Sequence, residues 1–292
     1  MKLKRLGNSK KSLPIITPEI IDFIKNNYEE GKSIVYISQK LDASPKLVSN
    51  IMKENNIHIR TNREQALKYK CNEAFFESID NEAKAYWLGF LYADGFILNN
   101  TKKEPTGVGI SLSEKDKEHL EKFKEALSFE GNIKTYQPSK NNSYSSSNYC
   151  RILVISPKIG RDLVEKGCSI QKTFCLNFPS VDIISPSLLS HFVRGYLDGD
   201  GSIKLSHNKK KNKMEFGISF LGTLEMLKGL QRVLGVEHLK LQQRFPERNN
   251  NNYSLDIGGR LQVYRILHWL YEDATVFLPR KKERYDILKN TF

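Results

Sequence analysis

The sequence predicts an α+β protein built from two tandem copies of one αββαββα unit, related by pseudo-two-fold symmetry and preceded by a small all-α domain. The repeat rests on two observations. The apolar stretches "WLGFLYADG" (87–95) and "VRGYLDGDG" (193–201) both end in an Asp-Gly pair, and each is followed by the same order of strand-like and helix-like segments. The helical domain rests on the basic, helix-favouring composition of the N-terminal segment.

The N-terminal segment, residues 1–60, has the pattern of three short helices with a tight turn between the second and the third. The helices are predicted to begin near Pro18, Ser33 and Pro45, where capping hydroxyls and first-turn prolines precede apolar residues at helical spacing. This order is typical of a helix-turn-helix domain. A small helical bundle with a solvated face would give the same pattern. The third helix would present four polar residues to DNA: Lys46, Ser49, Asn50 and Lys53.

Residues 61–85 are predicted to connect the helical domain to the repeat. Arg60 and the basic residues Arg63, Lys68 and Lys70 either follow DNA phosphates or belong to a solvated linker, and the sequence leaves both open.

The first half of the repeat is predicted over 86–180 and the second over 181–292. The segment "GVGISLSEKDKEHLEKFKEAL" resembles "EFGISFLGTLEMLKGLQRVLG", a strand followed by a helix in each half. The segments "EGNIKTYQP" and "EHLKLQQRFP" then alternate polar and apolar residues as strands do. Each half closes with a helix, "IGRDLVEKG" in the first and "QVYRILHWLYED" in the second.

The Asp-Gly pairs are the candidate site. A single Asp-Gly is most often a hairpin turn. Here Asp94 and Asp200 each follow a glycine by five residues, and glycine inside a helix costs about 1 kcal/mol unless another helix approaches closely. Close packing at Gly89 and Gly195 would place the two carboxylates side by side at helix C-termini, where they repel each other unless divalent cations bind there. Oxygen ligands of this kind suit Mg²⁺, with Mn²⁺ as a substitute, and paired metals can support phosphodiester hydrolysis.

The overall charge indicates a polyanionic partner. The chain has 46 Lys and Arg against 33 Asp and Glu, a formal net charge of +13, and residues 1–70 alone have 14 against 7. That partner is either a nucleic acid or an anionic membrane. No apolar run of membrane-spanning length is present, so a membrane span is not expected. The four cysteines form no C-x-x-C pair, which is typical of reduced thiols in the cytoplasm or an organellar matrix.

Other metal and nucleotide sites do not fit. The stretch "DGDGSI" begins like a calcium loop, but Ile203 occupies the position that needs glycine and Lys209 the position that needs glutamate. The six histidines have no zinc-site spacing, and no phosphate-binding glycine loop is present.

The two apolar stretches resemble the paired LAGLIDADG motifs of homing endonucleases, and the resemblance covers roughly residues 72–292. It implies two LAGLIDADG half-domains whose antiparallel sheets form a saddle over the DNA major groove. It also implies that Asp94 and Asp200 bind the catalytic metal together with the preceding residues, Ala93 and Gly199. The first motif departs from the family pattern at Tyr92, where the consensus has an acid that is not the usual metal ligand.

The resemblance further implies a basic residue near each scissile phosphate. Lys172 fits this place in the first half, and Lys281 or, as our chosen candidate, Lys282 fits it in the second. In the DNA-binding sheets that the resemblance implies, strand alternation picks the residues that would face the DNA. Its residues are Lys134, Tyr136, Lys204, Ser206, Lys240, Gln242 and Arg244. The loop 207–213, "HNKKKNK", is expected to meet phosphates.

The expected function is therefore that of a monomeric, site-specific double-strand DNA endonuclease with a long, asymmetric target. Two alternatives stay open. One is a transcription regulator on a scaffold that has lost catalysis, and the other is an RNA maturase that binds intron RNA and assists its splicing.

Overall fold

The computed structural model describes residues 15–61, 64, 69–137, 147–169, 175–209, 212–244, 246–247 and 251–292. The chain divides into two compact units, residues 1–65 and 66–292. Each unit has a hydrophobic core of its own. No helix within these ranges has the length and apolarity needed to cross a membrane.

The N-terminal unit contains three helices around a small apolar core: α1 (Pro18–Glu29), α2 (Ile34–Leu41) and α3 (Pro45–Glu54). The Ser33 hydroxyl caps α2 by accepting a hydrogen bond from the Tyr36 N–H at 3.0 Å. The Ser44 hydroxyl caps α3 in the same way. Asp42, at the turn between α2 and α3, has a left-handed backbone conformation with φ of 50°. The predicted helices are confirmed, while their role as a DNA-binding helix-turn-helix stays a prediction.

The second unit contains the repeat. The elements of its first half are α5 (Glu82–Ala93), β1 (Gly95–Asn99), β2 (Pro105–Ser113), a short 3-10 turn (Glu114–Asp116), α6 (Lys117–Ala126), β3 (Lys134–Tyr136), β4 (Tyr149–Val154) and α7 (Pro157–Glu165). A 3-10 turn (Pro186–Leu188) leads into the second half. Its elements are α9 (Leu189–Asp200), β5 (Ser202–Asn208), β6 (Lys213–Gly222), α10 (Leu224–Leu234), β7 (Gln242–Gln243), β8 (Tyr253–Gly258), α11 (Arg260–Tyr271) and α12 (Pro279–Lys289).

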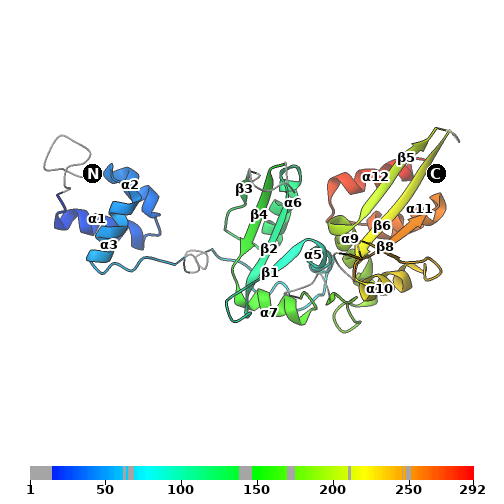
Figure 1. The fold of residues 1–292 in the computed structure, drawn as a ribbon, viewed down its shortest axis with the longest axis horizontal. Helices are drawn as coiled ribbons and strands as arrows, with labels where there is room; N and C mark the ends of the chain where they lie inside the picture. The colour runs from blue at the N-terminus through cyan, green and yellow to red at the C-terminus, as the bar shows by residue number, and fades with distance from the viewer. Residues whose placement is uncertain are drawn as a thin grey trace. The chain divides into compact units, whose positions relative to one another are not determined.

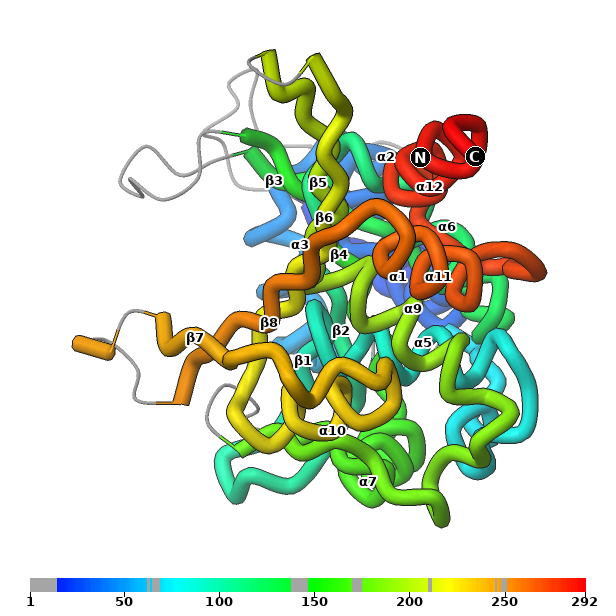
Figure 2. Tube along the Cα trace, turned by 90° about the vertical axis from the view of Figure 1, so that its right-hand side faces the viewer, coloured from blue at the N-terminus to red at the C-terminus, as the bar shows by residue number. Residues whose placement is uncertain are grey.

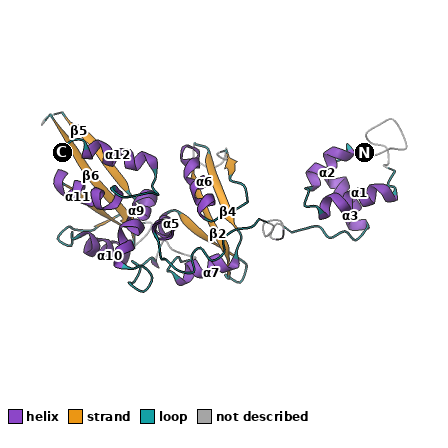
Figure 3. Ribbon diagram, turned by 180° about the vertical axis from the view of Figure 1, so that it is seen from behind, coloured by secondary structure: helices purple, strands orange, loops and turns teal. Residues whose placement is uncertain are grey.

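Each half forms one four-stranded antiparallel sheet, and the two sheets have equivalent strand orders, β1-β2-β4-β3 and β5-β6-β8-β7. In Figures 1 and 3 the helices α5 and α9 lie side by side between the two sheets. β5 and β6 extend beyond the rest of the second half (Figure 2). The predicted α+β fold with two tandem αββαββα halves is confirmed.

Two details differ from the prediction. The strand expected across "EHLKLQQRFP" shortens to Gln242–Gln243, because the preceding residues turn back on the end of α10 with Leu239 N–H donating to Val236 O. Lys240 therefore lies before the strand rather than in it. The helix α12, which follows the αββαββα pattern of the second half, was not predicted.

Candidate active site at the paired motif helices

The helices α5 and α9 cross at two glycines. A Cβ added at Gly89 would lie 2.0 Å from the carbonyl oxygen of Phe192, and one added at Gly195 would lie 2.0 Å from the carbonyl oxygen of Tyr86. The two contacts are equivalent, because Phe192 and Tyr86 each lie three residues before the crossing glycine of their own helix. The crossing is therefore reciprocal, which is the signature of a two-fold relation. Each glycine faces the partner backbone rather than the other glycine.

This crossing brings both motif aspartates to the same end of the helix pair. Asp94 caps the C-terminus of α5 and is partly exposed, while Asp200 is the last residue of α9 and is exposed. A Cβ added at Gly199 would lie 2.3 Å from the Ala93 Cβ and 3.5 Å from Asp94 Oδ2. The Asp94 carboxylate therefore lies against the last turn of the helix that ends in Asp200. The predicted juxtaposition of the two helix ends is present.

The oxygen atoms at this end fit a hard divalent cation. The Asp94 carboxylate lies against Gly199, and Asp200 is the next residue in the chain. Mg²⁺ typically binds one or two carboxylates and completes its shell with waters and phosphate oxygens. Over the described ranges, no group of three or more His, Cys, Asp and Glu side chains could hold a metal. A metal here would depend on the aspartate pair, backbone carbonyls and oxygen atoms from a bound phosphate.

Lys281, rather than Lys282, lies at this helix end. The Lys281 side chain is 3% exposed, and its Nζ donates hydrogen bonds to the carbonyl oxygens of Leu197, Asp198 and Gly201. A cation at these carbonyls complements the negative end of the α9 dipole. Burial lowers the pKa of Lys281 to about 8, even though Asp198, Asp94 and Asp200 act to raise it.

Lys282 points elsewhere. Its Nζ lies 2.5 Å from Asp286 Oδ1, one turn further along α12. The catalytic role expected for Lys282 stays a prediction, and the geometry favours its neighbour. Lys172, the candidate from the first half, lies outside the described residues.

A buried carboxylate that the sequence analysis did not single out supports the second motif helix. Asp198 is 1% exposed and accepts hydrogen bonds from Tyr86 Oη at 2.7 Å, Tyr271 Oη at 2.6 Å and Leu278 N–H at 2.7 Å. These donors come from α5, α11 and the start of α12, so Asp198 ties three elements to α9. Burial raises the pKa of Asp198. The sequence feature that could have pointed to Asp198 is the extra acid in "LDGDG", at the position where the first motif has Tyr92.

A buried ion pair also joins the two halves. Arg194 on α9 is 1% exposed, and its Nη2 lies 2.6 Å from Glu82 Oε1 on α5. The same guanidinium donates to the carbonyl oxygens of Leu270 and Val276, so all of its edges are used within the protein. Such a pair is expensive to bury but strongly destabilising to break on one side. The motif helices are therefore fixed by polar contacts as well as by packing.

The strand residues predicted to read DNA share the sheet faces that point away from the core. Directly opposed residues lie on one face of an antiparallel pair. The register places Lys134 opposite Arg151 and Tyr136 opposite Tyr149 in the first half. In the second half the opposed pairs are Lys204 with Gly217, Ser206 with Glu215, and Gln242 with Ser254. The alternate residues on these strands, such as Ile110, Ile152, Ile218 and Leu255, are buried.

Three of the predicted DNA-contact residues either lie outside the strands or already have a charged partner. Lys240 and Arg244 are exposed and flank β7, and Arg244 N–H donates to Asn252 O at 2.7 Å. Lys204 is already ion-paired, with its Nζ 3.4 Å from Asp256 Oδ1. Residues 210 and 211 of the basic loop lie outside the described residues.

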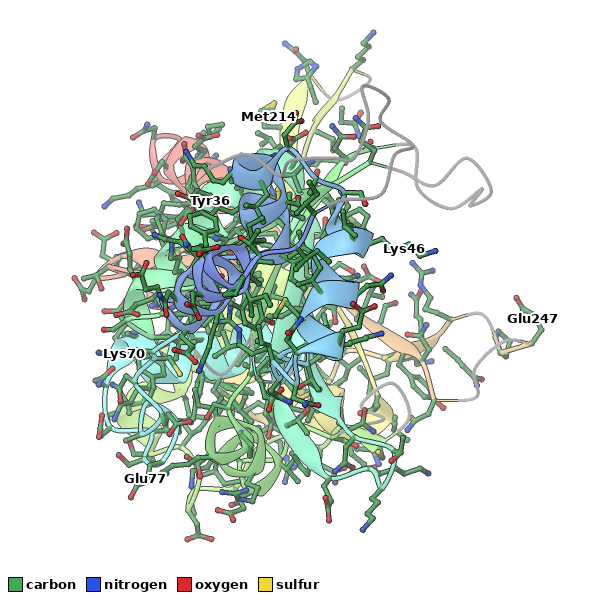
Figure 4. The ribbon with its side chains drawn as sticks, turned by 90° about the vertical axis from the view of Figure 1, so that its left-hand side faces the viewer. Tyr36, Lys46, Lys70, Glu77, Met214 and Glu247 are labelled. Atoms are coloured by element: carbon green, nitrogen blue, oxygen red, sulfur yellow. The ribbon has the colours of Figure 1, made fainter. Side chains whose placement is uncertain are left out.

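The N-terminal unit presents most of its predicted residues on the surface. Lys46, Asn50 and Lys53 are exposed on α3, and Ser49 is partly buried. Figure 4 shows Lys46 extending outward from this helix. Arg60 turns back on its own unit: its guanidinium lies 4.0 Å from the Tyr28 ring centroid, and its Nη2 donates to Lys32 O. Arg63 and Lys68 are outside the described residues.

Two αββαββα halves that meet through paired acidic motif helices define a single-chain, two-motif protein of the LAGLIDADG type. The chain belongs to the family of the LAGLIDADG-like domain, whose model matches residues 81–168 and 187–269. The two matched segments coincide with the two halves of the fold.

Solved structures that resemble the chain include three in complex with DNA. The LAGLIDADG homing endonuclease I-GzeII with its DNA target is 12% identical, with a TM-score of 0.47 over 73% of this chain and 89% of that one. The meganuclease I-SmaMI bound to uncleavable DNA with a TTGT central four is 17% identical, with a TM-score of 0.45 over 73% and 89%. The LAGLIDADG meganuclease I-CpaMI bound to uncleaved DNA is 14% identical, with a TM-score of 0.43 over 73% and 90%. No curated protein matches the chain.

Proposed function

We propose that this protein is a site-specific endonuclease that hydrolyses both strands of a long, asymmetric double-stranded DNA target in the presence of Mg²⁺, with Mn²⁺ as a substitute. The observation that carries the proposal is the placement of Asp94 and Asp200 at adjoining ends of two reciprocally packed helices. Carboxylates brought together at the negative ends of two helices repel each other, and a divalent cation between them relieves that repulsion.

Each aspartate would serve one scissile phosphate. Bound divalent metal at this end would lower the pKa of an attacking water and stabilise the leaving oxygen. Asp94 and Asp200 would hold it through their carboxylates, and the carbonyl groups of Ala93 and Gly199 lie within the same turn. Lys281 would keep the end of α9 in place by neutralising its carbonyl groups, so that the aspartate stays aimed at the phosphate.

The two outward sheet faces would form the DNA-binding surface. They carry basic side chains from both halves and the amide of Gln242 from the second, and arginine, lysine and glutamine suit contacts to base edges in the major groove. The net charge of +13 would add sequence-independent attraction to phosphates. The α3 face of the N-terminal unit would contribute further contacts.

Asp94→Asn and Asp200→Asn test the proposal directly. Each substitution keeps the size of the side chain and removes its charge. We expect each to reduce double-strand cleavage of a plasmid library in Mg²⁺ by at least about a thousandfold, because several kcal/mol of transition-state stabilisation depend on the metal. Binding to duplex DNA should remain. Asp273→Asn, an exposed carboxylate beyond the end of α11, is the matched control and should cut like the wild type.

The outcomes separate an endonuclease from a transcription regulator. Near-normal cutting by either motif variant would remove that aspartate from the active site. Sequence-specific binding by the wild type with no cleavage in Mg²⁺ or Mn²⁺ would identify a transcription regulator instead.

A further inference from the structure

The internal repeat makes one pair of surface residues equivalent by register. In the first half, Ser111 on β2 lies opposite Arg151 on β4. In the second half, Ser219 on β6 lies opposite Asp256 on β8. Ser111 and Ser219 both end the repeated tripeptide Gly-Ile-Ser, and β4 and β8 hold the same place in the two sheet orders. Arg151 and Asp256 therefore occupy the same position, in opposite halves, on the faces that point away from the core.

Arg151 is held in one orientation. Its Nε donates to Ser111 Oγ at 2.8 Å, and its Cζ lies 5.4–5.8 Å from the ring centroids of Phe96, Tyr136 and Tyr149. Tyr136 and Tyr149 stack on each other at 5.1 Å. Within the described part of the chain, Arg151 has no carboxylate partner. The fixed Nε leaves the two Nη groups as donors for a planar acceptor pair.

Asp256 is held with the opposite chemistry. It is one-third exposed and accepts hydrogen bonds from Ser254 Oγ at 3.0 Å and Lys204 Nζ at 3.4 Å. Burial alone would raise the pKa of Asp256, but hydrogen bonds from Ser219 and Ser254, together with Lys204, lower it below the ordinary value. The side chain is therefore an ionised acceptor at neutral pH.

We propose that Arg151 and Asp256 are paired specificity-determining residues, Arg151 reading a guanine in one half-site and Asp256 a cytosine at the equivalent position of the other. An arginine fork fits the O6 and N7 acceptors of guanine, and a carboxylate accepts from the N4 amino group of cytosine. In a palindromic target, equivalent positions would present the same base to equivalent residues. A donor in one half and an acceptor in the other make the target non-palindromic at this pair of positions.

Base edges are favoured over phosphates because of where the residues lie. β4 and β8 are inner strands, so their side chains leave the middle of each sheet face rather than its rim. The aromatic rings and the Ser111 hydroxyl around Arg151 also reduce the entropy that the side chain loses on binding, which favours a directional contact. This inference rests on the proposed DNA-cleaving function.

The test is a binding selection of full-length protein on a library of random duplexes, followed by sequencing. The wild type should enrich a motif in which, read along one strand, guanine is preferred at both of two positions equally far from the centre. The cytosine that Asp256 reads lies on the opposite strand and pairs with the second of these guanines, whereas a palindrome would show cytosine at that place. Arg151→Lys, which keeps the charge, should lower the guanine preference roughly tenfold to a hundredfold at the first position alone. Ser111→Ala should weaken the same preference, because it frees the guanidinium.

Asp256→Asn should act only at the second position, where adenine should replace cytosine because an amide pairs with adenine N6 and N7. Arg265→Lys, an exposed arginine on the outer side of α11, is the matched control and should leave the motif unchanged.

Three results would overturn the inference. One is a wild-type motif that neither substitution alters. Another is a pair of altered positions at unequal distances from the centre. The third is a reduced salt dependence with an unchanged motif for Arg151→Gln, which removes the charge, because this result would assign Arg151 to a phosphate. In each case a wild type that still cuts its selected sequence would leave the proposed function standing. A wild type that enriches no sequence and cuts none would refute both.

Discussion

Replacing either crossing glycine by alanine should separate the motif helices and uncouple the two aspartates. In Gly195→Ala the new Cβ would lie 2.0 Å from the Tyr86 carbonyl oxygen and 2.8 Å from the Phe90 nitrogen, whereas ordinary contact begins at 3.4 Å. Both atoms are backbone, so no side-chain rotation relieves the clash. The helices must move apart by more than an ångström.

Two opposing free-energy contributions set the size of the effect. Alanine gains about 1 kcal/mol of helix propensity over glycine. Overpacking a well-packed core costs about 1–3 kcal/mol and more where backbone atoms collide. We expect a net destabilisation of about 2 kcal/mol, which lowers the melting temperature of a unit of this size by roughly 4–8 °C. A shift of about 1 Å between catalytic groups should also reduce cleavage about a hundredfold.

The assays are thermal unfolding and plasmid cleavage for Gly89→Ala and Gly195→Ala in parallel. Because the two contacts are reciprocal, both variants should lose similar stability and activity. Gly258→Ala is the control for thermal unfolding, since a Cβ there meets nothing within 4 Å. A Gly195→Ala protein as stable and as active as the wild type would refute the close crossing.

Three further outcomes are expected. Burial lowers the pKa of His119 to about 3, so the unfolded chain takes up this proton first as the pH falls. The stability present above pH 6.5 should therefore be lost toward pH 3, by about 2 kcal/mol between pH 7 and pH 5. Urea unfolding of His119→Phe should show a fall in stability smaller by that amount, and an equal fall in both proteins would contradict the assignment. Residues 66–292 alone should still cut DNA. The slope of log affinity against log salt should become shallower by about 0.9 for each phosphate that the N-terminal unit neutralises in the full chain. An unchanged slope would show that this unit does not touch DNA. Sedimentation on a cleaved duplex should give one chain per site, since both motif helices belong to one chain, and two chains per site would contradict the monomer.

The sequence determined the parts of the site that depend on local pattern. Apolar runs ending in Asp-Gly placed Asp94 and Asp200 at helix ends, and the recurrence of the pattern predicted two equivalent halves. The glycines at 89 and 195 indicated a close crossing, because glycine inside a helix is costly without one. Strand alternation likewise placed Lys134 and Lys204 each on the outward face of its own sheet, because side chains alternate along any strand.

Only the tertiary structure decided the contacts between segments distant in the chain. Lys281 and Lys282 are adjacent and chemically identical in sequence, and the docking of α12 on the end of α9 buries one and leaves the other beside Asp286. Asp198 became a structural acceptor only when α5, α11 and α12 brought it donors. The equivalence of Arg151 and Asp256 requires the strand register, which depends on pairing across the whole sheet and not on the residues of either strand alone.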